Sequence, residues 1–305
     1  MEIQQLRHLL AVARHGSIGQ AAEVLNLSQP GLSRSIRALE DMLGLPLFER
    51  KARGVALTDH GRQLLTRAEV IVHEHDRAIA EARSAGSLRS GDVRLGMHDV
   101  LHGIGAVEAV GGFLDVNPTI GLSIDLSAGT VLVEKVARAE LDLAFTLFPP
   151  ELRGGEVHLE RLFELPCSIY QRRVGARSIR GAKGLADLLD HCWILAGGIN
   201  FRVAFEEQLA RLDLKLPAQF LQSSALAVTI DLVLARDMLT ILPDRLARSP
   251  RLAGQLERCA VRPPGGLPSA GLVYRREALR IPAVAAVAEC FRQFAATLRP
   301  LSEDA

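Results

Sequence analysis

The stretch 17–43 constrains the fold of this chain most, because it carries two helix-start signals that stand close together. Ser17 followed three residues later by Gln20 is a capping-box pattern, so we predict that a first helix begins at Ile18. This helix is short, and its apolar positions are Ala21, Ala22 and Leu25.

The second start signal is Ser28, the expected N-cap of a helix that has Pro30 in its first turn, where a missing N–H costs no hydrogen bond. Residues 26–27 make the break between the two helices. The helical spacing predicts one buried face, made of Leu32, Ile36, Leu39 and Leu43. The opposite face is polar and cationic, with Gln29, Pro30, Ser33, Arg34 and Arg37.

This pattern is typical of the helix-turn-helix, whose second helix enters the major groove of DNA. Glutamine can pair with adenine and arginine with guanine through two hydrogen bonds each, while serine and further arginines can hold phosphates. An ordinary helical hairpin with a solvated face is the competing interpretation.

The residues after the second helix favour the DNA-binding interpretation. Two short strand-like runs, 45–50 and 55–58, flank a turn, which predicts a hairpin. Arg50, Lys51 and Arg53 stand at its tip. Such a cationic wing suits a minor groove or phosphates.

Together these segments resemble the LysR-type transcriptional regulators. The resemblance rests on AAEVLNLSQPGLSRSIRALEDMLGLPLFER followed by GVALTDHG, and it weakens after residue 90 while still covering the whole chain. It implies a winged helix-turn-helix unit over residues 1–58 that includes a first helix at 3–15. The expected DNA-binding residues are Ser28, Gln29, Pro30, Ser33, Arg34, Arg37, Arg50 and Arg53.

A long helix is expected from Thr58 to about residue 85, followed by a small polar linker that ends at residue 90. Its apolar residues recur at spacings of three and four, which is a coiled-coil seam: Leu65, Ala68, Val72, His75, Ile79 and Ala82. We therefore expect this helix (59–90 with the linker) to pair with a second copy in a homodimer or homotetramer. The alternative is an amphipathic helix packed on its own domain.

From residue 91 to 305 short strands alternate with helices, so the fold class is α/β with an all-α N-terminus, and the alternation predicts parallel sheets. Strands are expected at 93–97, 120–126, 142–146, 157–163, 166–172, 192–195, 217–221 and 239–242. The runs 256–262 and 270–275 then lead back. Helices are expected at 102–115, 130–139, 183–190, 200–211, 224–236 and 281–298. Leu141–Phe145 is similar to the family's L-D-L-A-I signature.

The resemblance implies two lobes joined by crossing strands, as in type II periplasmic binding proteins. The first lobe is expected at 91–164 plus 267–305, and the second at 165–266. In open α/β sheets, ligands bind where strands end and helices begin. The expected effector-binding residues at such ends match the family's positions: His98, Asp99, Val100, Ser127, Gly129, Thr130, Gly198, Asn200, Phe201, Arg202 and Ser223.

His98 and Asp99 stand where the family usually has a small hydroxyl residue. This pair suits a polyol, a sugar acid or a cationic group, and Asp99 would repel a carboxylate unless His98 or Arg202 compensates. Alternatively, Asp99 caps the following helix and His98 lies at the surface. A ligand carboxylate on exposed N–H groups at 197–200, aided by Arg202, is a further alternative. The expected effector is a sugar acid or an aromatic acid.

Other classes of protein fit the sequence less well. No G-x-G-x-x-G follows the first strand, and the chain has no Walker loop and no G-x-S-x-G, so we expect no enzyme, no catalytic residues and no cofactor. His98 and His102 have the spacing of a metal pair, but no third ligand stands near, so we expect no metal. A solute-binding protein would need an export signal, and an architectural DNA-binding protein would not need so large a C-terminal region.

The net charge is only +1, so the basic character is local to the winged unit, as suits a site-specific reader of double-stranded DNA. No signal peptide and no run of 18 apolar residues is visible, so we expect a cytoplasmic protein without membrane contact. RNA polymerase is a further expected partner. The four cysteines, Cys167, Cys192, Cys259 and Cys290, are expected to be buried thiols, with a redox-sensing pair as the alternative.

Overall fold

The computed structural model describes residues 1–51, 54–83, 91–148, 155, 157–174, 179–197, 199–265 and 268–298. The chain divides into two compact units. One consists of residues 1–91 with 135–141, and the other of residues 92–134 with 142–305. None of the helices in the described ranges combines the length and the apolar character that crossing a membrane requires.

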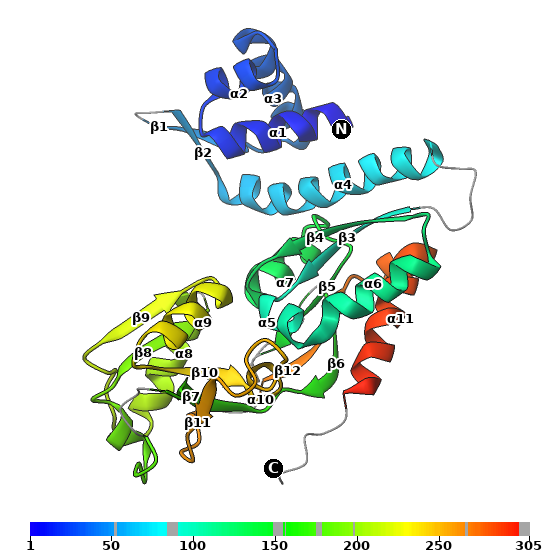
Figure 1. The fold of residues 1–305 in the computed structure, drawn as a ribbon. Helices are drawn as coiled ribbons and strands as arrows, with labels where there is room; N and C mark the ends of the chain where they lie inside the picture. The colour runs from blue at the N-terminus through cyan, green and yellow to red at the C-terminus, as the bar shows by residue number, and fades with distance from the viewer. Residues whose placement is uncertain are drawn as a thin grey trace. The chain divides into compact units, whose positions relative to one another are not determined.

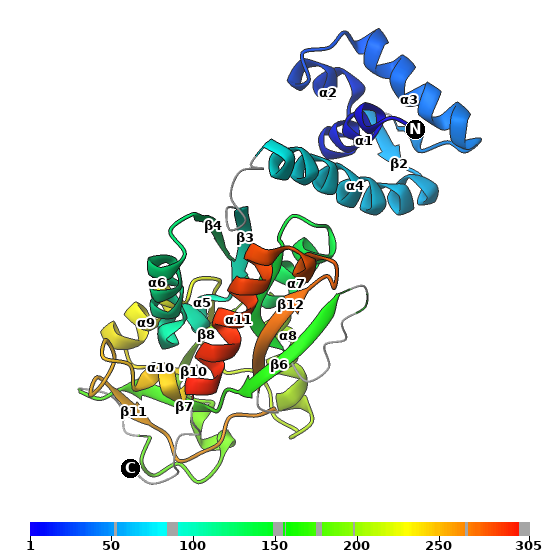
Figure 2. The same cartoon turned by 90° about the vertical axis from the view of Figure 1, so that its right-hand side faces the viewer.

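The N-terminal unit is a helical bundle with a two-stranded wing (Figures 1 and 2). Helix α1 packs against α2, α3 and α4, and the wing strands pair antiparallel with Arg50 opposite Val55. The elements are α1 (Ile3–His15), α2 (Ile18–Val24), α3 (Gln29–Leu43), β1 (Phe48–Lys51), β2 (Gly54–Leu57) and α4 (Asp59–Arg83). The predicted winged helix-turn-helix is therefore confirmed.

Both predicted N-caps are present. The Ser17 hydroxyl accepts a hydrogen bond from the N–H of Gln20 at 3.5 Å, and the Ser28 hydroxyl accepts one from the N–H of Gly31 at 3.2 Å. Asn26 takes a left-handed conformation, with φ at 54°, in the turn between α2 and α3. Local side-chain chemistry therefore sets where each helix of the motif begins.

One hydrophobic core holds this unit together. It is formed by Leu6, Leu9, Val12, Ala21, Ala22, Leu32, Ile36, Leu39, Leu47, Ala68 and Val72. The prediction that Leu43 belongs to the buried face is wrong, since 38% of Leu43 is exposed. Helix α3 ends at Gly44 and the chain turns there, so Leu47 rather than Leu43 lies in the core.

The expected coiled-coil seam of α4 is only partly available to a second copy. Ala68 and Val72 are buried in the core of the N-terminal unit, and Leu65 packs against that core. Helix α1 packs against α4. The alternative, in which α4 packs on its own domain, therefore holds for the first half of α4. Ile71 and Ile79 stay exposed, at 40% and 39%. The side chain of Ala82 lies outside the described residues.

The α/β unit contains two sheets of five strands each in its described part. The first has the order β4-β3-β5-β12-β6. Its strands are β3 (Gly91–Met97), β4 (Ile120–Leu126), β5 (Leu143–Phe148), β6 (His158–Glu164) and β12 (Ser269–Tyr274). Its helices are α5 (Asp99–Leu101), η1 (His102–Ala106), α6 (Val107–Val116), α7 (Gly129–Ala137), η3 (Ala278–Arg280) and α11 (Pro282–Thr297).

The second sheet has the order β11-β7-β10-β8-β9. Its strands are β7 (Cys167–Arg172), β8 (Cys192–Ala196), β9 (Phe220–Ser223), β10 (Met238–Pro243) and β11 (Leu256–Arg258). Its helices are η2 (Leu185–Leu188), α8 (Ile199–Ala210), α9 (Leu226–Ala235) and α10 (Asp244–Ala247). The chain passes from the first sheet to the second between β6 and β7, and it returns between β11 and β12.

The expectation of parallel sheets is wrong, because both sheets are mixed. Strands β3 and β5 are parallel, as are β8 and its neighbours β9 and β10. Strand β12 runs antiparallel to β5 and β6, and β7 runs antiparallel to β10 and β11. Strands β7 and β12 are each the first strand after a crossing between the sheets. Among the described residues, no helix directly precedes either of them in the chain, unlike the strands of a parallel β-α-β connection.

Several predicted elements differ from the structure in kind or in their bounds, among them the run 256–262, of which only Leu256–Arg258 forms a strand. The helix expected at 183–190 is only the short 3₁₀ turn η2. The helix expected at 102–115 begins earlier, at Asp99, and passes through the π turn η1, in which Gly105 has φ of 105°. The helix expected at 130–139 begins at Gly129 and ends at Ala137, and the strand expected at 217–221 begins at Phe220.

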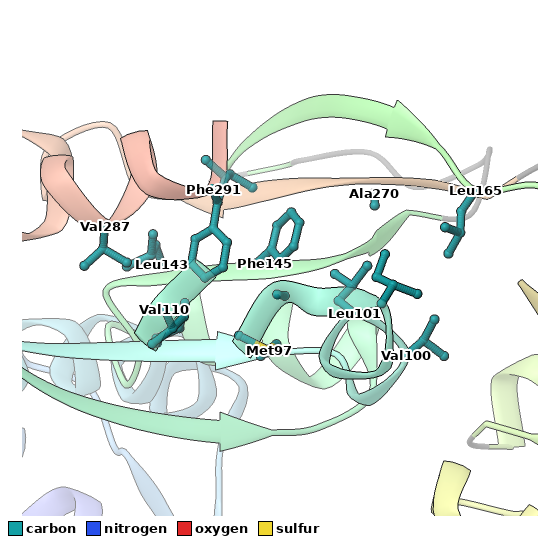
Figure 3. Close-up of a cluster of buried hydrophobic side chains, with 14 of the residues drawn as sticks. Met97, Val100, Leu101, Val110, Leu143, Phe145, Leu165, Ala270, Val287 and Phe291 are labelled. Carbon is teal, nitrogen blue, oxygen red and sulfur yellow. The ribbon is translucent and has the colours of Figure 1, made fainter. Parts of the chain in front are cut away.

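The core beside the first sheet centres on stacked rings (Figure 3). Phe145 of β5 and Phe291 of α11 stack with their centroids 4.5 Å apart. Helix α11 packs against β5, β6 and α6, and it buries Val284, Val287 and Phe291. This confirms the prediction that the last helix returns to the first lobe.

The Leu141–Phe145 signature has a structural explanation. Asp142 is 1% exposed in its side chain, and its two oxygens accept hydrogen bonds from the guanidinium and the backbone N–H of Arg94. The shorter side-chain contact is 2.8 Å. Because an unpaired buried carboxylate is costly, this pair fixes the start of β5 beside β3.

Gly61 yields a first prediction. A Cβ there would clash with the carbonyl oxygen of Leu47 and would lie 2.9 Å from a methyl group of Leu57. We expect Gly61→Ala to destabilise the N-terminal unit by about 1–3 kcal/mol, as measured by calorimetric unfolding of the full chain. Gly111 lies inside α6 with nothing within 4 Å of its Cβ position, so Gly111→Ala is the control and should stabilise by up to about 1 kcal/mol. Equal effects of the two changes would contradict the packing argument.

Candidate nucleic-acid interface and effector pocket

The face of α3 opposite its core residues is open to solvent. Ser28, Gln29, Pro30, Arg34 and Arg37 are exposed, and Ser33 is half-buried. Within the described part of the chain, neither Arg34 nor Arg37 forms an ion pair. The structure thus places five of the predicted DNA-binding residues on α3 and Ser28 at its N-cap, with both arginines available to a ligand.

A buried histidine connects α3 to α1. His8 of α1 is 7% exposed, and its Nδ1 lies 2.7 Å from the Ser35 hydroxyl on α3. Its Nε2 lies 3.2 Å from the amide nitrogen of Gln4, which places the ring proton on Nδ1 when the imidazole is neutral. Burial lowers the pKa of His8 below its ordinary value of 6.5. The sequence analysis missed this contact, whose only signal was a polar residue on an apolar stripe.

A carboxylate connects α3 to the wing. Glu40 Oε1 accepts hydrogen bonds from the backbone N–H groups of Leu47 at 2.7 Å and Phe48 at 3.1 Å. Its charge is therefore directed at the base of the wing. Because Glu40 lies on α3 and Phe48 begins β1, this contact fixes the wing relative to the candidate recognition helix.

The wing presents fewer described cations than expected. Arg50 is exposed, but Lys51 pairs with Glu49 at 2.8 Å, which neutralises part of its charge. Arg53 lies outside the described residues. Arg50 is therefore an exposed wing cation in the described part of the chain, and Lys51 is paired with a carboxylate.

In the α/β unit, the end of β3 differs from the alternative in which Asp99 caps the following helix. His98, rather than Asp99, is the N-cap of α5, since its Nδ1 accepts a hydrogen bond from the N–H of Val100 at 3.3 Å. Asp99 instead reaches the second sheet, where its Oδ2 accepts a hydrogen bond from the N–H of Leu226 at 3.0 Å. His98 Nδ1 also lies 3.1 Å from Asp99 Oδ1.

Asp99 is held in its ionised form. Burial raises the pKa of Asp99, but the hydrogen bond and charge of His98, together with the N–H groups of Leu226 and Val100, outweigh this effect and leave the pKa below its usual range. At neutral pH Asp99 is therefore a carboxylate that only accepts hydrogen bonds.

The side chain of Val100 is buried in the core, and its N–H lies within hydrogen-bond distance of His98 Nδ1. Thr130 is half-buried at the start of α7. Ser127 is half-buried, and its hydroxyl donates to Asp125 at 2.6 Å.

The ends of β3 and β5 and the start of α7 do meet. A Cβ on Gly129 would lie 2.9 Å from the carbonyl oxygen of Leu147, 3.1 Å from Thr146 Oγ1 and 4.0 Å from the His98 ring. The Thr146 hydroxyl is fully buried and has no hydrogen-bond partner among the described residues. The sequence analysis missed Thr146, although a threonine inside the apolar strand LAFTLF was a visible signal.

The end of β8 is less open than expected. The N–H of Gly197 donates to the carbonyl of Ser223 at 2.8 Å, so Gly197 does not offer this N–H to a carboxylate ligand. The reason is that Gly197 extends the pairing of β8 with β9. The Ser223 hydroxyl is engaged with the backbone of Ala225, and Arg202 lies over the ring of Phe220 at 5.6 Å. Gly198 and the side chains of Asn200 and Phe201 lie outside the described residues.

No group of three His, Cys, Asp or Glu side chains able to hold a metal ion occurs in the described ranges. All four cysteines are free thiols. Burial, with the nearby charge of Asp244, raises the pKa of Cys167 to about 12, and burial also raises the pKa values of Cys192 and Cys290. These three thiols stay protonated at neutral pH, so the redox-sensing alternative gains no support from their surroundings.

Comparison with known families identifies the class of protein. Residues 3–62 match the family described as bacterial regulatory helix-turn-helix protein, lysR family, and residues 86–296 match the LysR substrate binding domain. The fold and both segments define a regulator of the helix-turn-helix class. The chain belongs to the LysR family.

Curated relatives agree with this assignment. The SDS degradation transcriptional activation protein of Pseudomonas sp. (strain ATCC 19151) is 39% identical over 153 residues, and ClcR of Pseudomonas putida is 35% identical over 168 residues. These matches cover 50% and 53% of this chain and 48% and 56% of the relatives, so the chain spans about half the length of each. TdcA of Escherichia coli (strain K12) is 26% identical, with 79% of this chain and 78% of TdcA covered.

Solved structures support the fold alone. CbnR, a LysR family transcriptional regulator, superposes with a TM-score of 0.63 at 23% identity, covering 97% of this chain and 99% of CbnR. A full-length OxyR variant from Pseudomonas aeruginosa gives a TM-score of 0.61 at 22% identity, covering 96% of this chain and 95% of OxyR.

His8 yields a second prediction. Its folded pKa lies below its unfolded value of 6.5, so the unfolded chain binds more protons in that window. This contribution to stability is complete above pH 6.5 and is lost as the pH falls towards the folded pKa. His8→Phe keeps a buried ring but has no group that can bind a proton. When the pH is lowered from about 7 to about 5, this variant should therefore lose less stability than the wild type, as measured by unfolding of the full chain. If the variant has the same pH dependence as the wild type, the loss of stability at low pH comes from a group other than His8.

Proposed function

We propose that the protein is a sequence-specific DNA-binding transcriptional regulator whose α/β unit senses a small-molecule effector. The observation that carries this proposal is the exposed face of α3, which offers Gln29, Arg34 and Arg37 beside a wing in a chain of the LysR family. Glutamine and arginine on such a face can read base edges, and Ser28 and Ser33 can hold phosphates.

The contacts of α3 favour specific over indiscriminate binding. His8 and Glu40 fix this helix to α1 and to the wing, and a rigidly held helix loses little entropy when it binds. The net charge of the chain is only +1, so attraction to any nucleic acid is weak beyond the winged unit.

The proposed assembly is a homodimer or homotetramer, in which two winged units address two half-sites. The exposed residues Ile71 and Ile79 on α4 support pairing of this helix with a second copy. We propose that this pairing uses the face around Ile71, His75 and Ile79 rather than Leu65, Ala68 and Val72, which serve the chain's own core.

The proposed domain limits are 1–58 for the winged unit, 59–90 for the linker helix and 91–305 for the effector domain. Within the effector domain, the proposed lobes are 91–164 plus 267–305 and 165–266. The proposed effector site lies at the strand ends where His98 and Gly129 come together, because ligands of open α/β sheets bind where strands end and helices begin. A sugar acid or an aromatic acid is the proposed effector.

The mechanism follows from linkage between ligand and conformation. An effector that binds one arrangement of the two lobes more tightly than another shifts the population towards it, by no more than that difference in affinity. Helix α4 would transmit the change to the spacing of the winged units. We propose that the protein acts in the cytoplasm, with RNA polymerase as a further partner.

Selection of binding sequences from genomic DNA, followed by footprinting at a fixed salt concentration, tests the function. We expect a protected site with two-fold symmetry. Arg34→Ala should weaken binding to this site by about 1–3 kcal/mol if Arg34 reads a base. Arg34→Lys keeps the charge but loses the paired hydrogen bonds, so it should retain affinity for non-specific DNA and lose most of the discrimination.

Arg211→Ala is the matched control, since it removes the same charge from an exposed position in the α/β unit. It should leave binding to the selected site unchanged. Failure of the wild type to select any sequence would refute the regulator function, and an unchanged affinity of Arg34→Ala would remove Arg34 from the base-reading residues.

The α4 pairing is tested separately by sedimentation equilibrium. The double change Ile71→Asp and Ile79→Asp places charges in the proposed contact and should weaken dimerisation by at least about 100-fold. Val24→Asp is a comparable exposed change on α2 and should leave the molecular weight unchanged. A dimer that persists in the double variant would place the contact between copies elsewhere.

A further inference from the structure

One hydrogen bond joins residues that are 127 positions apart in the chain and lie on helices beside different sheets. Asp99 follows β3 of the first sheet, and Leu226 begins α9, which packs on β7, β8 and β10 of the second. The Asp99 carboxylate accepts the N–H of Leu226 at 3.0 Å. The contact is therefore a direct polar connection between the two halves of the α/β unit.

Helix α9 needs such an acceptor. Its N-cap residue is Ala225, which has no side-chain oxygen to receive the first N–H groups of the helix. The Ser223 hydroxyl accepts the N–H of Ala225, at 3.1 Å, but this is one residue too early to serve Leu226. Asp99 supplies the missing acceptor, and its negative charge is also favourable at a helix N-terminus.

The segment that carries Asp99 is packed against the second sheet at another point. A Cβ on Gly103 would lie 2.5 Å from a methyl group of Leu246 in α10, so any larger residue there would require the Leu246 side chain to shift. Leu101 and Ile104 belong to the same buried cluster as Leu226 and Leu246. Apolar packing therefore brings α5 and η1 to the second sheet, and the Asp99 carboxylate stands at the edge of this contact with 34% of its side chain exposed.

We propose that Asp99 is a positioning residue that acts as a built-in carboxylate ligand of α9. It connects the two lobes without any effector, and it excludes a carboxylate group of the effector from this helix end. The part concerning the effector rests on the proposed function, whereas the connection between the lobes does not.

This role determines what part of an effector can meet Asp99. An ionised carboxylate only accepts hydrogen bonds, so a hydroxyl or an ammonium group suits the exposed oxygen. An effector carboxylate would have to lie elsewhere, since it would meet both the charge of Asp99 and a helix end that is already occupied.

Hydrogen exchange of the full-length protein, measured without DNA or effector, tests the proposal. In Asp99→Ala the amide of Leu226 should exchange about fivefold faster, the usual effect of a lost helix cap. The amides of residues 99–106 should also exchange faster, because they lose part of their attachment to the second sheet. Asp99→Asn keeps an acceptor oxygen without the charge and should give a smaller change in both segments.

Added formate provides the decisive comparison. It should slow the exchange of Leu226 in Asp99→Ala, where the helix end is open, and should have no effect on the wild type, where Asp99 occupies it. Protection by formate in the wild type would show that the helix end is free and would overturn the proposal. An effect confined to Leu226, with residues 99–106 unchanged, would reduce Asp99 to a local cap and would overturn its role between the lobes.

Asp187→Ala is the matched control. Asp187 is another carboxylate that accepts backbone N–H groups, from Lys183 at 2.8 Å and Gly184 at 3.2 Å, but it does so within the second lobe. Its loss should leave both α9 and residues 99–106 unchanged, and a change there would attribute the Asp99 result to general destabilisation. DNA binding is measured apart from these experiments, so a protein that binds no specific DNA but shows the formate pattern would refute only the proposed function.

Discussion

The burial of Leu32, Ile36 and Leu39 against the rest of the N-terminal core determines which side of α3 faces outward. Because these residues recur at helical spacing, hiding them necessarily exposes Arg34 and Arg37. The hydrophobic effect thus places the cationic face, since it is apolar burial on one side of α3 that leaves the arginines on the other. The candidate recognition surface depends on this one packing arrangement.

Polar contacts then restrict how that helix is held. His8 and Glu40 both make side-chain hydrogen bonds from partly or fully buried positions, where an unmade bond is costly. They therefore favour one orientation of α3 relative to α1 and the wing over many alternatives of similar apolar burial. In the α/β unit, the Asp142–Arg94 pair plays the same part for β3 and β5.

Much of the candidate site was predictable from local sequence. The caps at Ser17 and Ser28, the helical spacing of α3 and the wing strands all follow from interactions within a few residues, which the order of the sequence reveals directly. The convergence of His98 and Gly129 followed from the general rule about strand ends. The closure of the Gly197 N–H by Ser223 was not predictable, because it depends on a strand neighbour that is distant in the chain.

By itself, the sequence determined the winged helix-turn-helix, the order of strands and helices in the α/β part and the face of α3 that stays polar, since each depends on periodicity and capping over short distances. Only the tertiary structure decided how shared surfaces are divided. In the tertiary structure, the first half of the apolar stripe of α4 packs in the core with α1, and the carboxylate of Asp99 accepts a hydrogen bond from the first residue of α9. A stripe or a carboxylate fits several partners equally well in sequence, and the choice falls to whichever partner the packed chain brings within contact distance.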